Sequence, residues 1–171
     1  MRTSNRDLRA LAKKKTIDRH AFVPFLLEVI TNRIGANANR LYQAELGVGL
    51  AEWRVLSSLA LEPGSSVVEL SDLSSIDAGA ISRVVFSMSA AGFISHEVDT
   101  TDRRRRKLVL TKRGLNLHDE MLKIALEEED RLLRNLNTEE RRHFVTTLQK
   151  LFGRIKDRPK RSALAAAAPD D

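Results

Sequence analysis

The sequence predicts a mainly α protein that carries one small two-stranded β element. Apolar residues recur at intervals of three and four over most of the 171 residues, which is the spacing of amphipathic helices. The pattern changes to short, strand-like apolar runs only at residues 93–98 and 107–110, on either side of a polar loop. We therefore expect helices to form the body of the fold, with a single hairpin between two of them.

The composition narrows the class of protein. The 29 Lys and Arg residues outnumber the 23 Asp and Glu residues, and the formal net charge of +6 favours a polyanionic partner, although it could serve solubility alone. The absence of cysteine excludes disulfides and thiolate sites. The sequence contains no run of about 18 consecutive apolar residues, the length that a membrane-spanning helix needs. The basic N-terminus does not resemble a secretory signal, so we expect a cytoplasmic protein without membrane partners.

The first predicted helix covers residues 20–44, with Pro24 in its first turn or at a kink. A turn broken by Gly47 and Gly49 follows, and residues 50–61 form the next helix, with Trp53, Leu56, Leu59 and Ala60 on its inner face. The Pro63-Gly64 pair ends that helix.

Local signals mark the ends of the remaining elements. Ser66 precedes Glu69 by three residues, the pattern of a capping box, and opens a short helix to about Leu73. Asp77 caps the following helix, which ends at Gly92, a residue suited to a left-handed C-terminal cap. After the hairpin, Thr111 caps a helix that runs to about Leu133, and a capping pair at Asn137 and Glu140 starts the last helix.

Two short helices joined by a tight turn and followed by a hairpin predict a winged helix-turn-helix. In that geometry the second helix enters the major groove of DNA by its N-terminal part, where small and polar side chains allow close approach. Its exposed first turns supply five candidate DNA contacts: Ala78, Gly79, Ala80, Ser82 and Arg83. Ser82 can bond base edges or phosphate, and Arg83 can bond guanine or phosphate in bidentate fashion. The alternative is an ordinary surface helix.

The loop between the two strands ends in four arginines: Arg103, Arg104, Arg105 and Arg106. Like charges at a hairpin tip repel one another and have no structural use there, so we expect them to contact the minor groove or the DNA backbone. A solvated run of charges is the alternative.

Several segments in this order resemble the MarR family of transcriptional regulators. The run from Asp102 to Thr111, followed by Gly114, is similar to the family's wing signature, and Arg104 matches its key arginine two positions after an acidic residue. The other similar segments are residues 50–56, 68–73, 76–83 and 92–94. The sequence departs from the family at Ala78-Gly79-Ala80, where lysine, serine or threonine is common, so base readout should depend more on Ser82, Arg83, shape and the wing.

The resemblance implies a homodimer in which the first and last helices of each chain pair, and in which two recognition helices address a palindromic operator. The number of apolar positions in the outer helices agrees, because a small winged domain could not cover them all. We expect an arm at residues 1–17, dimerisation helices at 18–46 and 112–156, the winged helix-turn-helix at 47–111 and a disordered tail at 157–171.

Catalysis and cofactors find no support in the sequence. The four histidines are not paired at metal-ligand spacing, no nucleophile or phosphate-loop motif is present, and the acidic run at residues 127–130 reads as a solvated helix face. The resemblance also implies a response to a small aromatic or phenolic effector, as is common in the family. Trp53, Arg40 and His20 could contribute to such a site, or they could be a core tryptophan and surface charges. The effector residues stay unknown.

We therefore expect a sequence-specific DNA-binding transcriptional regulator, a repressor released by a small molecule, and not an enzyme. Two alternatives stay open. One is a nonspecific nucleic-acid-binding protein that uses the same charges, and the other is a winged-helix protein-interaction module without DNA binding.

Overall fold

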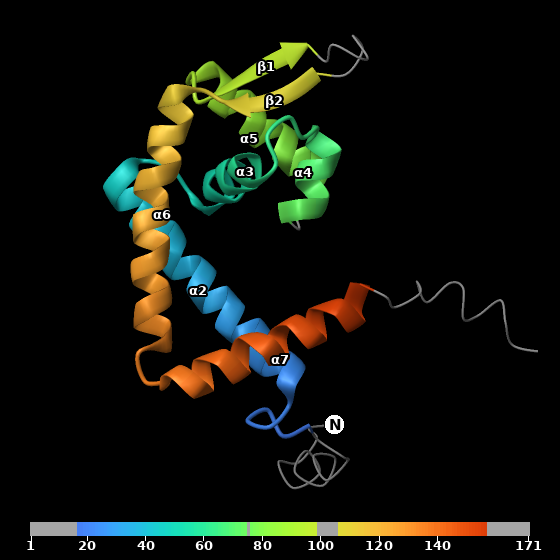
Figure 1. Ribbon diagram of the computed structural model, residues 1–171, viewed down its shortest axis with the longest axis vertical. Helices are drawn as coiled ribbons and strands as arrows, with labels where there is room; N and C mark the ends of the chain where they lie inside the picture. The colour runs from blue at the N-terminus through green and yellow to red at the C-terminus, as the bar shows by residue number, and fades with distance from the viewer. Residues whose placement is uncertain (1–16, 75, 99–105, 157–171) are drawn as a thin grey trace, which may run out of the picture. The chain divides into compact units, whose positions relative to one another are not determined.

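The computed structural model describes residues 17–74, 76–98 and 106–156, which form six helices and one two-stranded sheet (Figure 1). A mainly α fold with a small β wing is therefore confirmed. The predicted tail, and the predicted arm except for Ile17, lie outside the described residues. The chain divides into one compact unit up to Ala125 and a second from Leu126. No described helix is long and apolar enough to cross a membrane.

Helix α2 (Val23–Leu46) and helix α3 (Leu50–Leu61) are joined by the predicted glycine turn. Pro24 lies in the first turn of α2, where its missing N–H costs no helical hydrogen bond, and Gly47 ends the helix with a φ of 70°. The backbone N–H of Leu50 donates to the Asn39 side chain at 3.0 Å, which fixes the start of α3 against α2.

Helix α4 (Val67–Ser74) starts with the predicted capping box. The Glu69 carboxylate accepts from the Ser66 backbone N–H at 2.7 Å, and the Ser66 hydroxyl accepts from the Glu69 N–H at 3.3 Å. Helix α5 (Ala78–Ala90) ends at a left-handed Gly92, whose φ is 77°. The predictions that Ser66 and Glu69 open α4 and that Gly92 closes α5 are therefore confirmed.

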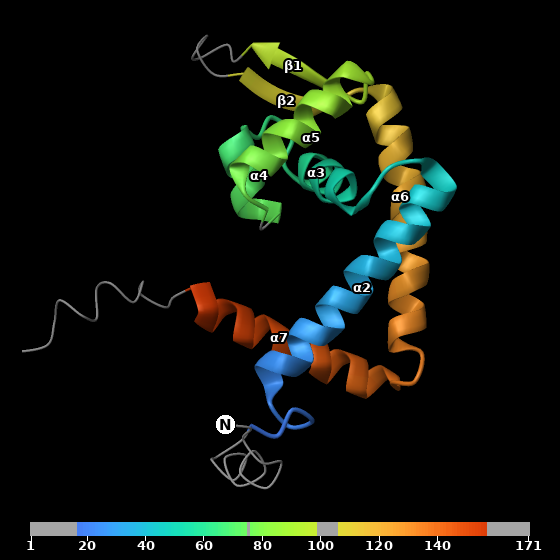
Figure 2. The same ribbon diagram turned by 180° about the vertical axis from the view of Figure 1, so that it is seen from behind.

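The wing consists of β1 (Ile94–Val98) and β2 (Arg106–Leu110), which pair antiparallel from Ile94 opposite Leu110 to Val98 opposite Arg106. β1 contacts α5 and β2 contacts α3 (Figures 1 and 2). The hairpin is thereby packed on α3 and α5, two helices of the predicted winged domain.

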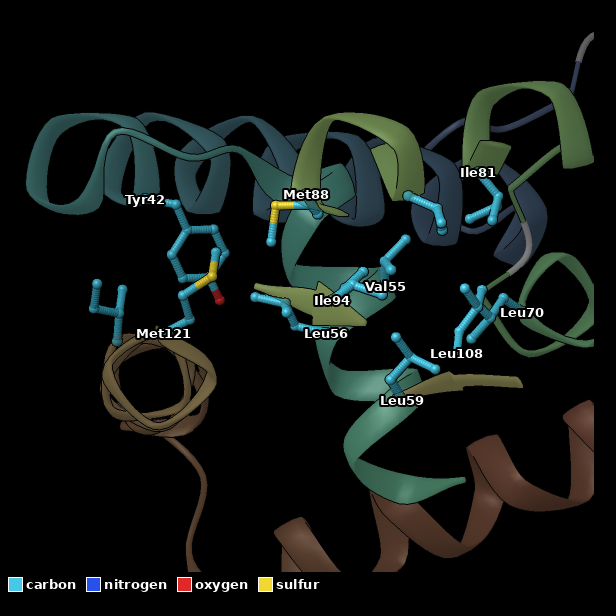
Figure 3. Packing of buried hydrophobic residues seen from close by; sticks show 12 residues of the cluster. Tyr42, Val55, Leu56, Leu59, Leu70, Ile81, Met88, Ile94, Leu108 and Met121 are labelled. Carbon is cyan, nitrogen blue, oxygen red and sulfur yellow. The ribbon is translucent and has the colours of Figure 1, made fainter. Parts of the chain in front are cut away.

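One hydrophobic cluster holds the first unit together, with side chains from α2 to α6 and from both strands (Figure 3). The predicted inward residues of α3 are buried at Leu56 and Leu59, while Trp53 and Ala60 are half-buried. The buried set is Tyr42, Val55, Leu56, Leu59, Leu70, Ile81, Val85, Met88, Ile94, Leu108, Met121 and Ile124. Leu73, one of the apolar positions of α4, is 42% exposed.

Helix α6 (Lys112–Leu133) begins in the first unit and continues into the second, which also contains α7 (Thr138–Lys156). The Asn137 side chain accepts from the N–H groups of Glu139 and Glu140, both at 3.0 Å, as the predicted cap of α7. The Glu140 carboxylate accepts in return from the Asn137 N–H at 2.8 Å. This reciprocal pair fixes the first residue of α7.

Candidate nucleic-acid interface

The N-terminus of α5 is held by Asp77, which has extended backbone angles and accepts from the Ala80 N–H at 2.9 Å. In the preceding turn, the Ser71 hydroxyl donates to the carbonyl of Ile76 at 2.6 Å. Since Asp77 and Ser71 satisfy backbone groups on both sides of the turn, the angle between α4 and α5 is set by local hydrogen bonds as well as by the core.

Helix α5 has two distinct faces. Ile81, Val85 and Met88 are buried against the cluster, at 0%, 5% and 2% exposure. Exposed residues spaced three and four apart form the opposite face, because such residues lie above one another on a helix. We call this the outward face of α5, and its members are Gly79, Ser82, Arg83, Phe86 and Ala90.

Four of the five candidates on α5 lie where the sequence predicts. Ala78, Gly79, Ser82 and Arg83 are exposed, but Ala80 is half-buried, so the prediction that its side chain is exposed is wrong. Ala80 lies on the flank of the helix between the outward face and the buried face. Of the exposed four, only Ser82 and Arg83 carry polar side chains.

The Arg83 guanidinium lies over the start of its own helix. A Cβ atom built on Gly79 would lie 3.9 Å from Arg83 Nη1. Within the described part of the chain, no carboxylate forms an ion pair with Arg83. An exposed cation therefore lies beside small side chains at the end of a helix whose free N–H groups favour anions.

The wing lies on the same domain, fixed by backbone bonds to the turn between α3 and α4. The Gly64 N–H donates to the Leu108 carbonyl at 2.9 Å, and the Leu108 N–H donates to the Ser65 carbonyl at 3.3 Å. The turn therefore pairs with one edge of β2, while β1 pairs with the other edge. Of the predicted wing contacts, Arg106 begins β2, whereas Arg103, Arg104 and Arg105 lie outside the described residues.

Comparison with known proteins identifies this arrangement. The family model described as MarR family matches residues 46–105, from the end of α2 into the segment between the strands. The HTH-type transcriptional regulator BilQ of Clostridium symbiosum (strain WAL-14163) is 30% identical over 111 residues, which are 65% of this chain and 76% of that protein. The chain belongs to the MarR family.

Solved structures of MarR proteins share the fold. A MarR/EmrR family transcriptional regulator from Acinetobacter sp. ADP1 gives a TM-score of 0.74 at 27% identity, over 84% of this chain and 100% of that chain. A MarR family protein from Mycobacterium tuberculosis, in complex with salicylic acid, gives 0.65 at 25% identity, over 77% and 96%. The expected membership is confirmed, and the chain is a winged-helix transcriptional regulator of this family.

The Thr and Gly that close the MarR wing signature have a structural reason here. The Thr111 hydroxyl donates to the Gly92 carbonyl at 2.7 Å, and its oxygen accepts from the Gly114 N–H at 3.1 Å. Gly114 is packed so closely on the Phe93 carbonyl that a Cβ atom there would overlap it. Thr111 and Gly114 therefore connect the exit of α5 to the start of α6.

Sequence reasoning missed two residues that lie at notable places. Phe86 lies on the outward face of α5 with 77% of its surface exposed, and its spacing from Ser82 and Arg83 was the available signal. The ring of His118 in α6 stacks on Trp53 with centroids 5.6 Å apart. No local sequence pattern indicates the stack of His118 on Trp53, because 65 residues separate the two.

The three residues considered for an effector are placed differently from one another. Trp53 is half-buried between Tyr42 and His118. Arg40 and His20 are exposed; the Arg40 guanidinium donates to the Asn37 side chain, and the His20 N–H donates to the Asp18 carboxylate. Among the described residues, no hydrogen bond, ion pair or ring contact joins the three to one another.

Proposed function

We propose that this MarR-family chain regulates transcription by binding a specific duplex sequence, with α5 in the major groove. The observation that carries the proposal is the outward face of α5, where small residues and exposed Ser82 and Arg83 occur at helical spacing opposite a buried apolar face. An α-helix fits the major groove, and small residues at its N-terminal end let the backbone approach the base edges.

The proposed contacts divide by chemistry. Arg83 would bond guanine or a phosphate, Ser82 a base edge or phosphate, and Ala78, Gly79 and Ala80 would permit close approach, with Ala80 at the margin. The arginines of the wing, Arg103, Arg104, Arg105 and Arg106, would follow the adjacent minor groove or its phosphates, as their number and place in the sequence suggest. Arginine favours the negative potential of a narrow minor groove.

The proposal includes a homodimer on a palindromic operator. The outer helices each expose several large apolar side chains, an arrangement that favours association of two chains. These are Val23, Ile30 and Ile34 of α2, Leu115, Leu122, Leu126 and Leu132 of α6, and Phe144, Val145, Leu151, Phe152 and Ile155 of α7. We assign dimerisation to residues 18–46 and 112–156 and DNA binding to residues 47–111.

The proposal is completed by a repressor role, in which a small aromatic or phenolic effector would release the chain from its DNA. The M. tuberculosis relative in complex with salicylic acid supports this class of ligand. The expected result is that salicylate weakens binding of the protein to its selected duplex. We do not assign pocket residues.

The test is selection of duplexes from a random pool by the full chain, followed by titration of the selected duplex against a scrambled competitor. A specific regulator should bind a sequence with inverted half-sites more than about tenfold more tightly than the scrambled competitor. Uniform binding that falls steeply with salt would instead indicate the nonspecific alternative. No binding at low salt would indicate a winged-helix interaction module and would overturn the proposal.

A further inference from the structure

Phe86 is the most exposed large apolar residue in the described part of the chain. Its 77% exposure compares with 5% for its neighbour Val85, which faces the core on the same helix. Leaving an aromatic ring in water forgoes its burial energy, so an exposed phenylalanine on a rigid helix is informative about contacts outside the chain.

The position of Phe86 relates it directly to the proposed DNA contacts. It follows Arg83 by three residues, Ser82 by four and Gly79 by seven, so all four share the outward face of α5. At the helical rise of 1.5 Å per residue, the Cα of Phe86 lies roughly 4.5 Å beyond that of Arg83 along the axis. This is little more than the spacing of successive bases, about 3.4 Å along one strand.

The surroundings of Phe86 fit nucleic acid better than an apolar protein partner. Its exposed neighbours on α5 are the small or polar residues Ser82, Ser87 and Ala90 and the cation Arg83, so Phe86 is the one large apolar side chain that this helix exposes. Helix α5 contains no acidic residue between Ala78 and Ala90, so nothing on the helix itself repels phosphate. A protein docking site would need more contiguous apolar area.

A phenyl ring can read only one feature of the major groove. It neither donates nor accepts an ordinary hydrogen bond, and the apolar group that B-DNA presents there is the C5-methyl of thymine. We propose that Phe86 contacts the methyl group of one thymine in each half-site and so specifies a T·A pair next to the position contacted by Arg83. This inference rests on the proposed function and names a specificity residue within it.

The experiment replaces each thymine of the duplex selected by the full chain, one at a time, with deoxyuridine, which differs only in lacking that methyl group. We expect wild-type affinity to fall about fourfold at one symmetric thymine position, the factor that corresponds to one buried methyl group. In Phe86→Ala the overall affinity should fall about tenfold, and deoxyuridine at that same position should have no further effect.

Two variants serve as controls. Phe86→Leu keeps an apolar side chain on the outward face, so it should retain part of the deoxyuridine penalty. Leu61→Ala removes a residue of similar exposure, 76%, from the end of α3, and should leave the whole pattern of penalties unchanged. Thermal unfolding of each variant should match wild type, because neither side chain is buried.

The outcomes distinguish this inference from the function on which it rests. If the chain selects a duplex but wild type and Phe86→Ala lose the same affinity at every deoxyuridine position, the methyl contact is refuted while specific binding stands. Penalties confined to other positions, or a selected site without thymine, would refute it equally. If no duplex is selected, both the proposed function and this inference fail.

Discussion

The imidazole of His118 stacks on the indole of Trp53, with the ring centroids 5.6 Å apart and the planes inclined by 19°. On the same indole, Tyr42 packs at 5.9 Å with a tilt of 38°. The three rings come from α6, α3 and α2 respectively. Since α3 also belongs to the winged helix-turn-helix, these three rings join that domain to α2 and α6 within the first unit.

The stack predicts a measurable coupling between Trp53 and His118. In a double-mutant cycle of Trp53→Leu and His118→Ala, urea unfolding should give a coupling free energy of about 0.5–1.5 kcal/mol, the range for a well-placed aromatic pair. His96→Ala is the matched control, because His96 is exposed on β1 and should combine with Trp53→Leu additively. Additive behaviour of the Trp53–His118 pair would contradict the stack.

Gly114→Ala should destabilise the fold. The added Cβ would overlap the Phe93 backbone carbonyl, which is not the end of a flexible side chain, so the exit of α5 or the start of α6 must move. We expect a loss of about 1–3 kcal/mol in unfolding free energy, the usual cost of overpacking. Differential scanning calorimetry would measure it as a lower Tm.

Gly153→Ala is the control for that substitution. An added Cβ at Gly153 meets nothing within 4 Å, and the residue lies inside α7. The change should stabilise the helix by about 0.5–1 kcal/mol because alanine loses less backbone entropy than glycine. Equal effects of the two substitutions would show that close packing at Gly114 is not the cause.

Arg83 and Arg113 should separate DNA binding from stability. Arg83→Ala should weaken binding to the selected duplex by about 1–3 kcal/mol and change the preferred base, with little effect on unfolding. Arg113 donates to the Ala91 carbonyl at 2.9 Å and lies over the Phe93 ring at 4.5 Å. Its replacement by alanine should therefore cost about 0.5–1 kcal/mol of stability and leave base preference intact. Fluorescence anisotropy would measure DNA binding and thermal melts would measure stability for both variants. A loss of base preference in Arg113→Ala, or a large loss of stability in Arg83→Ala, would contradict the prediction.

Asp77 should act through the cap it forms. Asp77→Ala removes the acceptor for the Ala80 N–H and should cost about 1 kcal/mol of stability. Asp77→Asn keeps an acceptor oxygen, so its Tm should stay near that of wild type. A comparable loss in both variants would indicate that the charge of Asp77 matters and that the cap does not.

Charged replacement of Phe152 should prevent dimerisation. Phe152 in α7 is 63% exposed in the single chain, and glutamate there would place a charge in the proposed apolar interface. Sedimentation at micromolar concentration should give a dimer for wild type and a monomer, or aggregate, for Phe152→Glu. A folded wild-type monomer under the same conditions would count decisively against the homodimer.

The parts of the fold that local chemistry determines could be predicted from the sequence. The capping pairs at Ser66–Glu69 and Asn137–Glu140 involve residues three apart, so the sequence contains both partners within one turn. Asp77 likewise lies within one turn of Ala80, from whose N–H it accepts a hydrogen bond. Gly92 is a local signal of its own, because its left-handed φ suits the end of a helix. These signals predict α4, α5 and the turn between them, and the bounds of α5 determine which of its residues share the outward face.

Features that depend on contacts between distant segments could not be predicted in the same way. Ala80 looks like its neighbours in the sequence, and its half-buried state depends on how α5 is rotated against the core. Met121 is fully buried, whereas Leu122 beside it is 36% exposed, a choice made by the packing of α6. The exposure of Phe86 likewise depends on the rotation of α5 against the core, although its spacing from Ser82 and Arg83 indicates which face it shares.

The pairing of Gly64 and Ser65 with Leu108 has a consequence for how such proteins can change over time. The place of β2 beside the turn between α3 and α4 is set by main-chain groups and so depends little on side-chain chemistry, except at Gly64, whose φ is 91°. The left-handed Gly64 and the buried Leu108 restrict substitution within this pairing, whereas the exposed side chains of α5 take no part in it. Relatives could thus acquire new target sequences through α5 and the wing tip without rebuilding the scaffold that aims them.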